Sequence, residues 1–252
     1  IDRSRGLGDV YKRQFFMIKI RTLFFCLSIV LFSGILSAQS LEDKIKDYII
    51  KNPEVILKSL ENYEKKKEEN DKIKNKKNVE FNKSQLLDSS NGLFSGNKDG
   101  QKILVEFFDY NCTYCKKAHK DIKKLISNDE NIKVIYKNFP ILSEESLKLS
   151  KIAIFLGKKS NLDFKKFHNE IIEHKGFVSD EKLRMIIKNI GYNPDLLFSE
   201  LNKDYLVNEV KKDVELAKIL NLRGTPVFIA NNELVFGYVG FDELNTMLDT
   251  QQ

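Results

Sequence analysis

The sequence predicts an α/β fold in which a strand–helix–strand unit and a strand–strand–helix unit flank a block of helices. Short apolar runs predict the strands, and apolar residues that recur every three or four positions predict the helices. Asn231-Asn232, between two apolar runs, indicates a hairpin. The expected elements are strands at 102–108 and 132–136 around a helix at 112–127, helices throughout 144–220, strands at 226–230 and 233–236, and a last helix at 242–248.

The first 38 residues are expected to be absent from the mature protein. Residues 1–16 are interpreted as non-native or read-through sequence. Residues 17–38 have a positively charged start, an apolar stretch over 23–32 and a small-residue cleavage site at 36–38, the pattern of a secretory signal peptide. A membrane anchor is the alternative, but the apolar stretch of about 14 residues is shorter than the roughly 20 that a span needs. Export predicts a periplasmic location, where thiols are readily oxidised.

The charge of the mature chain argues against nucleic-acid binding. The whole sequence carries a net charge of +6, and residues 1–38 hold six Lys or Arg and two Asp or Glu, so +2 remains after cleavage. Only two arginines remain, Arg184 and Arg223. Nucleic-acid binders usually cluster arginines with aromatic residues. The many lysines are therefore interpreted as a solvated surface.

Residues 39–78 are expected to form an N-terminal helical arm and a charged linker. Two short helices are predicted within 41–63, separated by Asn52-Pro53-Glu54, which supplies a helix N-cap and a first-turn proline. Residues 64–78 are nearly all charged or polar, as in a solvated helix extension or a flexible linker. The arm either folds back onto the main domain, 79–252, or forms a homo-oligomer. The sequence favours self-association through Ile45, Ile49, Ile56 and Leu60.

Cys112 and Cys115 are the only cysteines of the mature chain, because Cys26 lies in the predicted signal peptide. A structural disulfide over so short a loop would remove little chain entropy, roughly 2 kcal/mol. A redox pair explains the setting better, since Cys112 would lie in the first turn of a helix. Backbone N–H groups and the helix dipole stabilise a thiolate there.

No metal site is predicted. A closed zinc site takes four ligands, and the mature chain has no second cysteine pair. His119 follows Cys115 by four residues on the same helical face, so a Cys2His cluster for Cu(I) stays an alternative. His168 and His174 are expected on helix surfaces.

Two further positions are expected beside the cysteines. Glu106 shares a strand face with apolar residues, so its carboxyl should lie beneath the pair and relay a proton to or from Cys115. The alternative is that Glu106 reaches water at a strand edge. Pro226 opens a later strand, and with a Cys-x-x-Cys pair upstream the Thr225–Pro226 bond is expected to be cis.

The motifs VEFFDYNCTYC and GTPVFI, with the helical block between them, resemble the DsbA family of thioredoxin-fold thiol:disulfide oxidoreductases over roughly residues 86–250. The N-terminal arm resembles the extra segment of oligomeric relatives of the suppressor-of-copper-sensitivity type. The resemblance implies a thioredoxin fold with an inserted helical lobe. It also implies that Cys112 is the nucleophile, Cys115 the resolving cysteine, Glu106 the buried acid and Pro226 the cis-proline facing the disulfide.

The predicted function is therefore a periplasmic thiol:disulfide oxidoreductase that forms disulfides in exported proteins and needs no cofactor. Thr225 and Pro226 would contact substrate, and a membrane oxidase or reductase would recycle the pair. Thr113 stands where many relatives have proline, which leaves the redox potential open. Thr225 and the predicted arm keep an oligomeric isomerase or reductase as an alternative. From another class, a periplasmic copper-binding protein stays open.

Overall fold

The computed structural model describes residues 40–249, and the predicted read-through segment and signal peptide lie outside them. The chain divides into two compact units, with the boundary between Lys66 and Lys67. The second unit carries Cys112 and Cys115.

The first unit begins with α2 (Leu41–Lys51), the first of the two helices expected in the arm. Ser40 caps this helix, because its Oγ accepts a hydrogen bond from the backbone N–H of Asp43 at 3.1 Å. Asn52 is the C-cap of this helix, whereas the sequence predicted it as the N-cap of the next one. No residue of α2 is buried, although the helix carries several large apolar side chains.

The second helix of the arm continues through the charged run, which is the helix extension that the sequence left open beside a flexible linker. α3 spans Glu54–Phe81, so the charged run at 64–78 is helical. Lysine and glutamate, which dominate this run, are strong helix formers. Val79 near the end of α3 is buried in the core of the second unit. The domain start expected at residue 79 therefore falls inside a helix.

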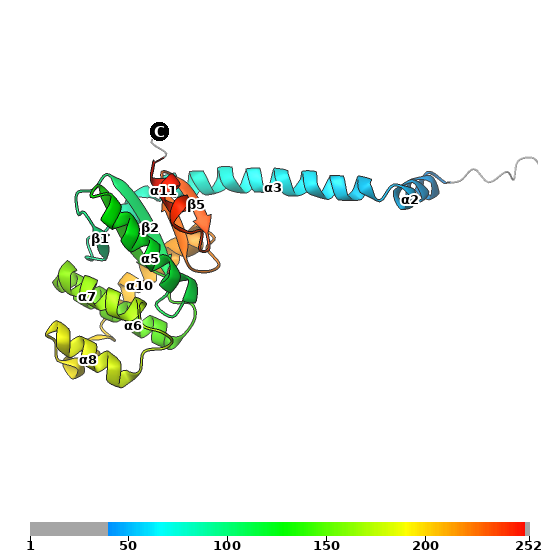
Figure 1. Ribbon diagram of the computed structural model, residues 1–252. Helices are drawn as coiled ribbons and strands as arrows, with labels where there is room; N and C mark the ends of the chain where they lie inside the picture. Colours follow the sequence, from blue (N-terminus) through cyan, green and yellow to red (C-terminus); the bar gives the residue numbers. More distant parts are fainter. Residues whose placement is uncertain (1–39, 250–252) are drawn as a thin grey trace, which may run out of the picture. The chain divides into compact units, whose positions relative to one another are not determined.

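The second unit is built on a five-stranded sheet with the order β1-β3-β2-β4-β5 (Figure 1). β2 and β3 are parallel, and the other neighbours are antiparallel. The edge strand β1 was not predicted, because three residues are too few to show a period. The strands are β1 (Phe94–Gly96), β2 (Lys102–Phe108), β3 (Ile132–Asn138), β4 (Val227–Ala230) and β5 (Glu233–Phe236).

Apolar side chains are buried on both faces of the sheet. Leu104 and Phe108 of β2 belong to a core cluster with α5 and the inserted helices. Val105 and Phe107, which alternate with them, belong to a second cluster with the end of α3, with α4 and with α10. The helices outside the lobe are α4 (Lys83–Leu87), α5 (Thr113–Asn128) and α11 (Phe241–Asp249).

The residues expected to be helical throughout 144–220 form an inserted lobe, which is gathered below the sheet in Figure 1. Ser179 caps one of its helices, because its Oγ accepts from the backbone N–H of Lys182 at 3.2 Å. The lobe returns to the sheet through contacts of α7 with β1 and of α10 with β3. Its helices are α6 (Glu144–Lys159), α7 (Asn161–Ile172), α8 (Asp180–Ile190), α9 (Pro194–Glu200) and α10 (Asp204–Ile219).

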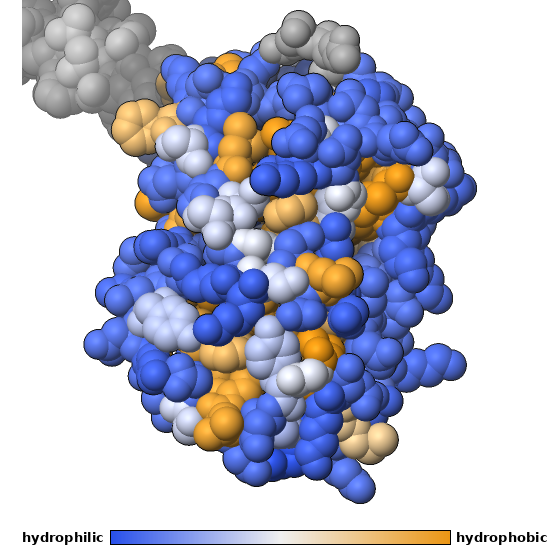
Figure 2. All heavy atoms as spheres, turned by 90° about the vertical axis from the view of Figure 1, so that its left-hand side faces the viewer, coloured by the Kyte–Doolittle hydropathy of each residue, from blue (hydrophilic) through white to orange (hydrophobic). Residues whose placement is uncertain are grey.

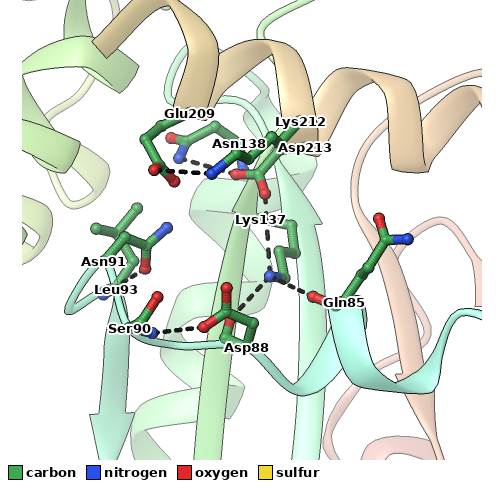
Figure 3. A network of polar contacts seen from close by, with 10 residues as sticks. All are labelled: Gln85, Asp88, Ser90, Asn91, Leu93, Lys137, Asn138, Glu209, Lys212 and Asp213. Carbon is green, nitrogen blue, oxygen red and sulfur yellow. Dashed lines mark hydrogen bonds and ion pairs between the residues drawn. The ribbon is translucent and has the colours of Figure 1, made fainter. Parts of the chain in front are cut away.

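A buried polar clamp joins β3, α10 and the segment around α4 (Figure 3). Lys137 Nζ donates to the backbone carbonyls of Gln85 and Asp88, both at 2.8 Å. It also lies 3.9 Å from Asp213 Oδ1. Asp213 Oδ2 accepts from the backbone N–H of Asn138 at 2.8 Å. Both charged side chains are buried, and the clamp fixes the segment before β1 to β3 and α10.

The face drawn in Figure 2 is mainly hydrophilic, and hydrophobic side chains show there as separate patches. A partner on this face would meet mostly charged and polar groups. None of the helices within residues 40–249 combines the length and the apolar character that crossing a membrane requires.

Candidate functional site

The loop between β2 and α5 holds Cys112 at the start of a helix. The backbone N–H of Cys112 donates to the carbonyl of Asp109 at 3.0 Å. The Asp109 carboxylate accepts from the backbone N–H groups of Asn111 at 2.8 Å, Ile141 at 2.9 Å and Leu142 at 3.0 Å. Cys112 is thus the N-cap residue of α5, one position earlier than a first-turn residue. Its thiol lies where the first backbone N–H groups of the helix have no partner within the helix.

The Cys112 thiol is held in a setting that favours the thiolate. As a thiol, its Sγ donates to the carbonyl of Thr225 at 3.2 Å. The hydrogen bond with the Cys115 thiol is the largest influence that lowers the pKa of Cys112, to about 5. The Thr225 side chain and the backbone N–H groups of Cys115 and Tyr114 lower it further, and burial opposes them. Cys112 therefore carries a negative charge at neutral pH.

Cys115 has the opposite properties. It is 1% exposed, and burial raises its pKa well above the ordinary value for a thiol. The hydrogen bond with Cys112 and the charge of Glu106 raise this pKa further. Both cysteines are free thiols in this structure. The pair therefore combines a thiolate at the helix start with a protonated thiol beneath it.

Glu106 lies in the interior of the sheet and not at a strand edge. β2 has β3 on one side and β4 on the other, and Glu106 pairs with Tyr136 and Phe228. Glu106 is only 3% exposed. Burial, and after it the negative charge of Cys112, raise its pKa to about 8. The alternative in which Glu106 reaches water is therefore wrong, and the carboxyl keeps its proton at neutral pH.

The segment before β4 faces the cysteine pair from far along the chain. The Thr225–Pro226 peptide bond is cis. The carbonyl of Pro226 accepts a hydrogen bond from the backbone N–H of Gly237 at 2.9 Å. The carbonyl of Thr225, one residue earlier, points at Cys112. The fold thus brings together the two cysteines, Glu106 and Thr225.

The structure corrects the expectation for His168. This residue is 1% exposed, and its Nδ1 lies 3.2 Å from Tyr110 Oη. Its ring packs against Tyr136, with 4.3 Å between the ring centroids. Burial lowers the pKa of His168 well below the ordinary value, so the ring is neutral. The sequence held a signal for this, because His168 follows the apolar Phe164 by one helical turn.

His119 and His174 do not assemble a metal site with the cysteines. His119 is buried, and its Nε2 lies 3.3 Å from Glu173 Oε1. His174 is half-buried. Within residues 40–249, no three side chains of His, Cys, Asp or Glu are placed to hold a metal ion. The expected alternative of a Cys2His cluster through His119 is therefore not formed.

We expect a Glu106→Gln variant of the reduced protein to be more stable at neutral pH. The folded protein keeps this carboxyl protonated up to about pH 8, whereas the unfolded chain ionises it near 4.5. Between these values unfolding releases a proton, so the wild-type protein loses stability as pH rises. The gain from Gln should be about 3 kcal/mol at pH 7 and should vanish towards pH 4.5.

Urea unfolding at pH 4.5, 5.5 and 7 measures the effect of the Glu106 substitution. Exposed Glu130 supplies the control, and Glu130→Gln should change little at any of these pH values. A gain from Glu106→Gln that does not depend on pH would contradict the assignment of a protonated carboxyl.

Comparison with known proteins matches the two parts of the chain separately. Residues 103–249 match the family model of the DSBA-like thioredoxin domain, and residues 39–70 match that of the copper resistance protein ScsC N-terminal domain. The disulfide bond formation protein D of Bacillus subtilis (strain 168) is 24% identical over 166 residues, which are 62% of this chain and 75% of that protein.

Solved structures agree with this division. The thiol-disulfide exchange protein alpha-DsbA2 from Wolbachia pipientis is 33% identical with a TM-score of 0.63, over 69% of this chain and 94% of that chain. A linker-deletion mutant of Proteus mirabilis ScsC shares the fold at 22% identity and a TM-score of 0.65, over 84% of this chain and 96% of that one. Because the first family match spans more than half of the sequence, the chain belongs to the DSBA-like thioredoxin domain family, and its N-terminal arm is ScsC-like.

Proposed function

We propose that this protein is a periplasmic thiol:disulfide oxidoreductase that forms disulfides in exported proteins through Cys112 and Cys115. Family membership supports thiol–disulfide chemistry. The contrast between the two thiols carries the assignment of roles, because Cys112 has a pKa of about 5 and the buried Cys115 a raised one. The signal-peptide pattern at 17–38 supports the location.

The reaction starts from the oxidised pair. A substrate thiolate attacks Cys112 Sγ, a bond forms between the two sulfurs, and the Cys112–Cys115 bond breaks with Cys115 as the leaving thiolate. The second substrate thiolate then attacks the substrate sulfur of the mixed disulfide, and Cys112 leaves as a thiolate. The substrate gains a disulfide, and the protein keeps one thiolate and one thiol, so one of the two substrate protons passes to solvent.

Glu106 is suited to supply the proton that Cys115 takes up when it leaves. Its carboxyl is protonated at neutral pH, and a charge on Glu106 raises the pKa of Cys115. A proton delivered beneath the pair makes Cys115 a better leaving group and discourages it from attacking the mixed disulfide. A membrane oxidase would then remove two electrons from the reduced pair and restore the disulfide.

The reduction potential of the pair should lie near −180 mV. A nucleophile pKa of about 7 accompanies about −270 mV in thioredoxin, and about 3.5 accompanies about −120 mV in DsbA. The pKa of about 5 for Cys112 falls between them. Equilibration with glutathione buffers, followed by counting of free thiols, measures the potential. A value below about −250 mV would contradict the oxidase assignment and favour a reductase.

The direction of the reaction is tested with two substrates. The oxidised protein should convert a reduced peptide with two cysteines into its disulfide form. Rescue of a scrambled protein alone, without oxidation of the reduced peptide, would make the protein an isomerase. The exposed apolar arm is the observation that favours this second candidate, because an oligomer could hold a misfolded substrate among several active sites.

The arm is proposed to assemble copies of this chain. Ile45 and Ile49 of α2 and Ile56 and Leu60 of α3 are between 36% and 52% exposed. Single exposed apolar residues are ordinary, but several along one segment indicate an interaction site. The ScsC-like match covers all four positions. Self-association through these side chains would remove them from water.

We expect the double variant Ile56→Asp/Leu60→Asp to be monomeric, because two buried carboxylates without partners are too costly for an interface. Ile73→Asp is the matched control, since Ile73 is also an exposed residue of α3 but is not one of the four proposed interface residues. Light scattering on the full chain from residue 39 gives the molar mass of each. A wild-type monomer, or a control that dissociates equally, would overturn the proposal.

A further inference from the structure

A cavity of about 850 Å³ opens beside the cysteine pair, between α5 and the turn that follows α7. Asn111 and Thr113, the two neighbours of Cys112 in the chain, form part of its wall. Glu173 and the residues up to Phe177 form the opposite wall. Because Asn111 and Thr113 flank Cys112, the cavity is within reach of the residues next to a cysteine bound at Cys112, since an extended chain advances about 3.3 Å per residue.

The cavity is strongly basic. Its walls carry five lysines and a single carboxylate, that of Glu173. Glu173 is already paired, with Lys123 Nζ at 2.7 Å from its Oε1. The walls therefore keep an excess of positive charge next to the reactive thiol. The five lysines are Lys116, Lys117, Lys120, Lys123 and Lys175.

The lysines differ in what they already bind. Lys116 Nζ donates to the carbonyls of His174 at 2.9 Å and Gly176 at 2.7 Å, so it fixes the turn that forms the outer wall. Lys117 lies over the ring of Tyr238. Lys120 and Lys175 make no ion pair with any carboxylate of residues 40–249. These two cations are the ones available to a ligand.

Apolar surface accompanies the charge. Phe177 at the rim is 71% exposed, and Ile172 contributes to the wall. The cavity thus offers cations, an aromatic ring and an aliphatic side chain.

We propose that this cavity binds an acidic segment of the substrate polypeptide, next to the cysteine that reacts with Cys112. The inference rests on the proposed function and names a substrate class for it. Aspartate and glutamate side chains would pair with Lys120 and Lys175, and an apolar neighbour would cover Phe177. Charge complementarity selects this occupant, because a basic segment would meet four net positive charges.

The effect should appear mainly in the rate of encounter. Exposed charge pairs contribute little to stability and are screened by salt, but a basic cleft raises the association rate of an acidic ligand. With two acidic residues beside the cysteines, we expect reaction about tenfold faster than for a neutral peptide at low ionic strength. The advantage should shrink to about twofold at 200 mM salt.

Reduced peptides with two cysteines and a flank of Glu-Glu-Phe, Gln-Gln-Phe or Lys-Lys-Phe test the proposal, with the oxidised full-length protein in excess. The double variant Lys120→Gln/Lys175→Gln should lose most of the preference for the acidic peptide. The control Lys188→Gln/Lys211→Gln changes the net charge equally outside the cavity and should keep the preference. Equal rates for the acidic and neutral peptides, or equal behaviour of the two variants, would overturn the proposal.

A second measurement separates this inference from the proposed function. Labelled peptides in which serine replaces cysteine report binding by fluorescence anisotropy without any chemistry. Tighter binding of the acidic peptide, lost in Lys120→Gln/Lys175→Gln, supports the proposed peptide site in the cavity. If the same protein fails to oxidise dithiothreitol, that failure contradicts only the proposed oxidase function. Normal oxidation of dithiothreitol without a preference among the peptides overturns the cavity alone.

Discussion

A Cys112→Ser variant should lose disulfide exchange, with a fall in rate on the order of 10³-fold or more, to the uncatalysed background. Serine cannot form the intramolecular disulfide, and it removes the only thiolate of the pair at neutral pH. Cys115→Ser also cannot turn over, but its Cys112 thiolate should still attack a disulfide and form a mixed disulfide. The serine hydroxyl can still donate to Cys112, which preserves much of the low thiol pKa.

The two serine variants are compared by their reaction with a peptide disulfide. Thiolates and not thiols attack disulfides, so reduced Cys115→Ser should form a stable mixed disulfide through Cys112. Reduced Cys112→Ser should react at least about a hundredfold more slowly, because its remaining thiol is buried and protonated at pH 7. Mass spectrometry of the adducts measures both rates. Equal adduct formation by the two variants would contradict the roles of Cys112 as the nucleophile and Cys115 as the resolving cysteine.

Lys137→Met should cost about 3 kcal/mol of folding stability at pH 7. The substitution leaves the buried carboxyl of Asp213 without its cation and the carbonyls of Gln85 and Asp88 without their donor. Burial already raises the pKa of Asp213 to about 6 with Lys137 present. Loss of the lysine raises it further, so unfolding releases this proton over a wider pH range. The cost should therefore be greater at pH 7 than at pH 5.

Urea unfolding at both pH values checks the Lys137 prediction. Lys211→Met on the exposed face of α10 is the control and should change stability by less than about 0.5 kcal/mol. The double variant Lys137→Met/Asp213→Leu should recover part of the loss, because neither charge is then buried alone. A cost as small as that of the control would show that the clamp does not stabilise the fold.

Much of the site could be predicted because its residues obey local rules. A strand that ends at Phe108 and a helix that starts near Cys112 place the cysteine at a helix start. Strand alternation placed Glu106 on the face of Leu104. The strand start and the upstream Cys-x-x-Cys pair indicated a cis bond at Pro226, and the family resemblance placed this proline opposite the disulfide, because periodicity alone could not relate residues separated by more than a hundred positions.

Other features depend on tertiary contacts that no local pattern reports. Lys137 lies on a β3 face that would suit solvent, but α10 and the segment at α4 cover that face. The sequence left open whether the charged half of α3 is a helix extension or a flexible linker, because this half has no apolar period. The sequence analysis placed His168 on a helix surface because histidine is a polar residue type. The hydrogen-bond partner of His168, Tyr110, lies 58 positions earlier in the sequence.

The stabilisation of the Cys112 thiolate at the start of α5 affects the thermal stability of the protein. The interactions that favour the thiolate exist only in the folded, reduced protein, and closing the disulfide removes the anion that they stabilise. A thermodynamic cycle links folding to oxidation. If folding favours the dithiol by a certain free energy, the disulfide form is less stable towards unfolding by the same free energy. A cross-link ordinarily makes a protein harder to melt; here the oxidised form should be the easier one to melt. Under the proposed oxidase function, each disulfide that the protein transfers would relieve this destabilisation, and the folding free energy of the protein would contribute to the oxidation of its substrate.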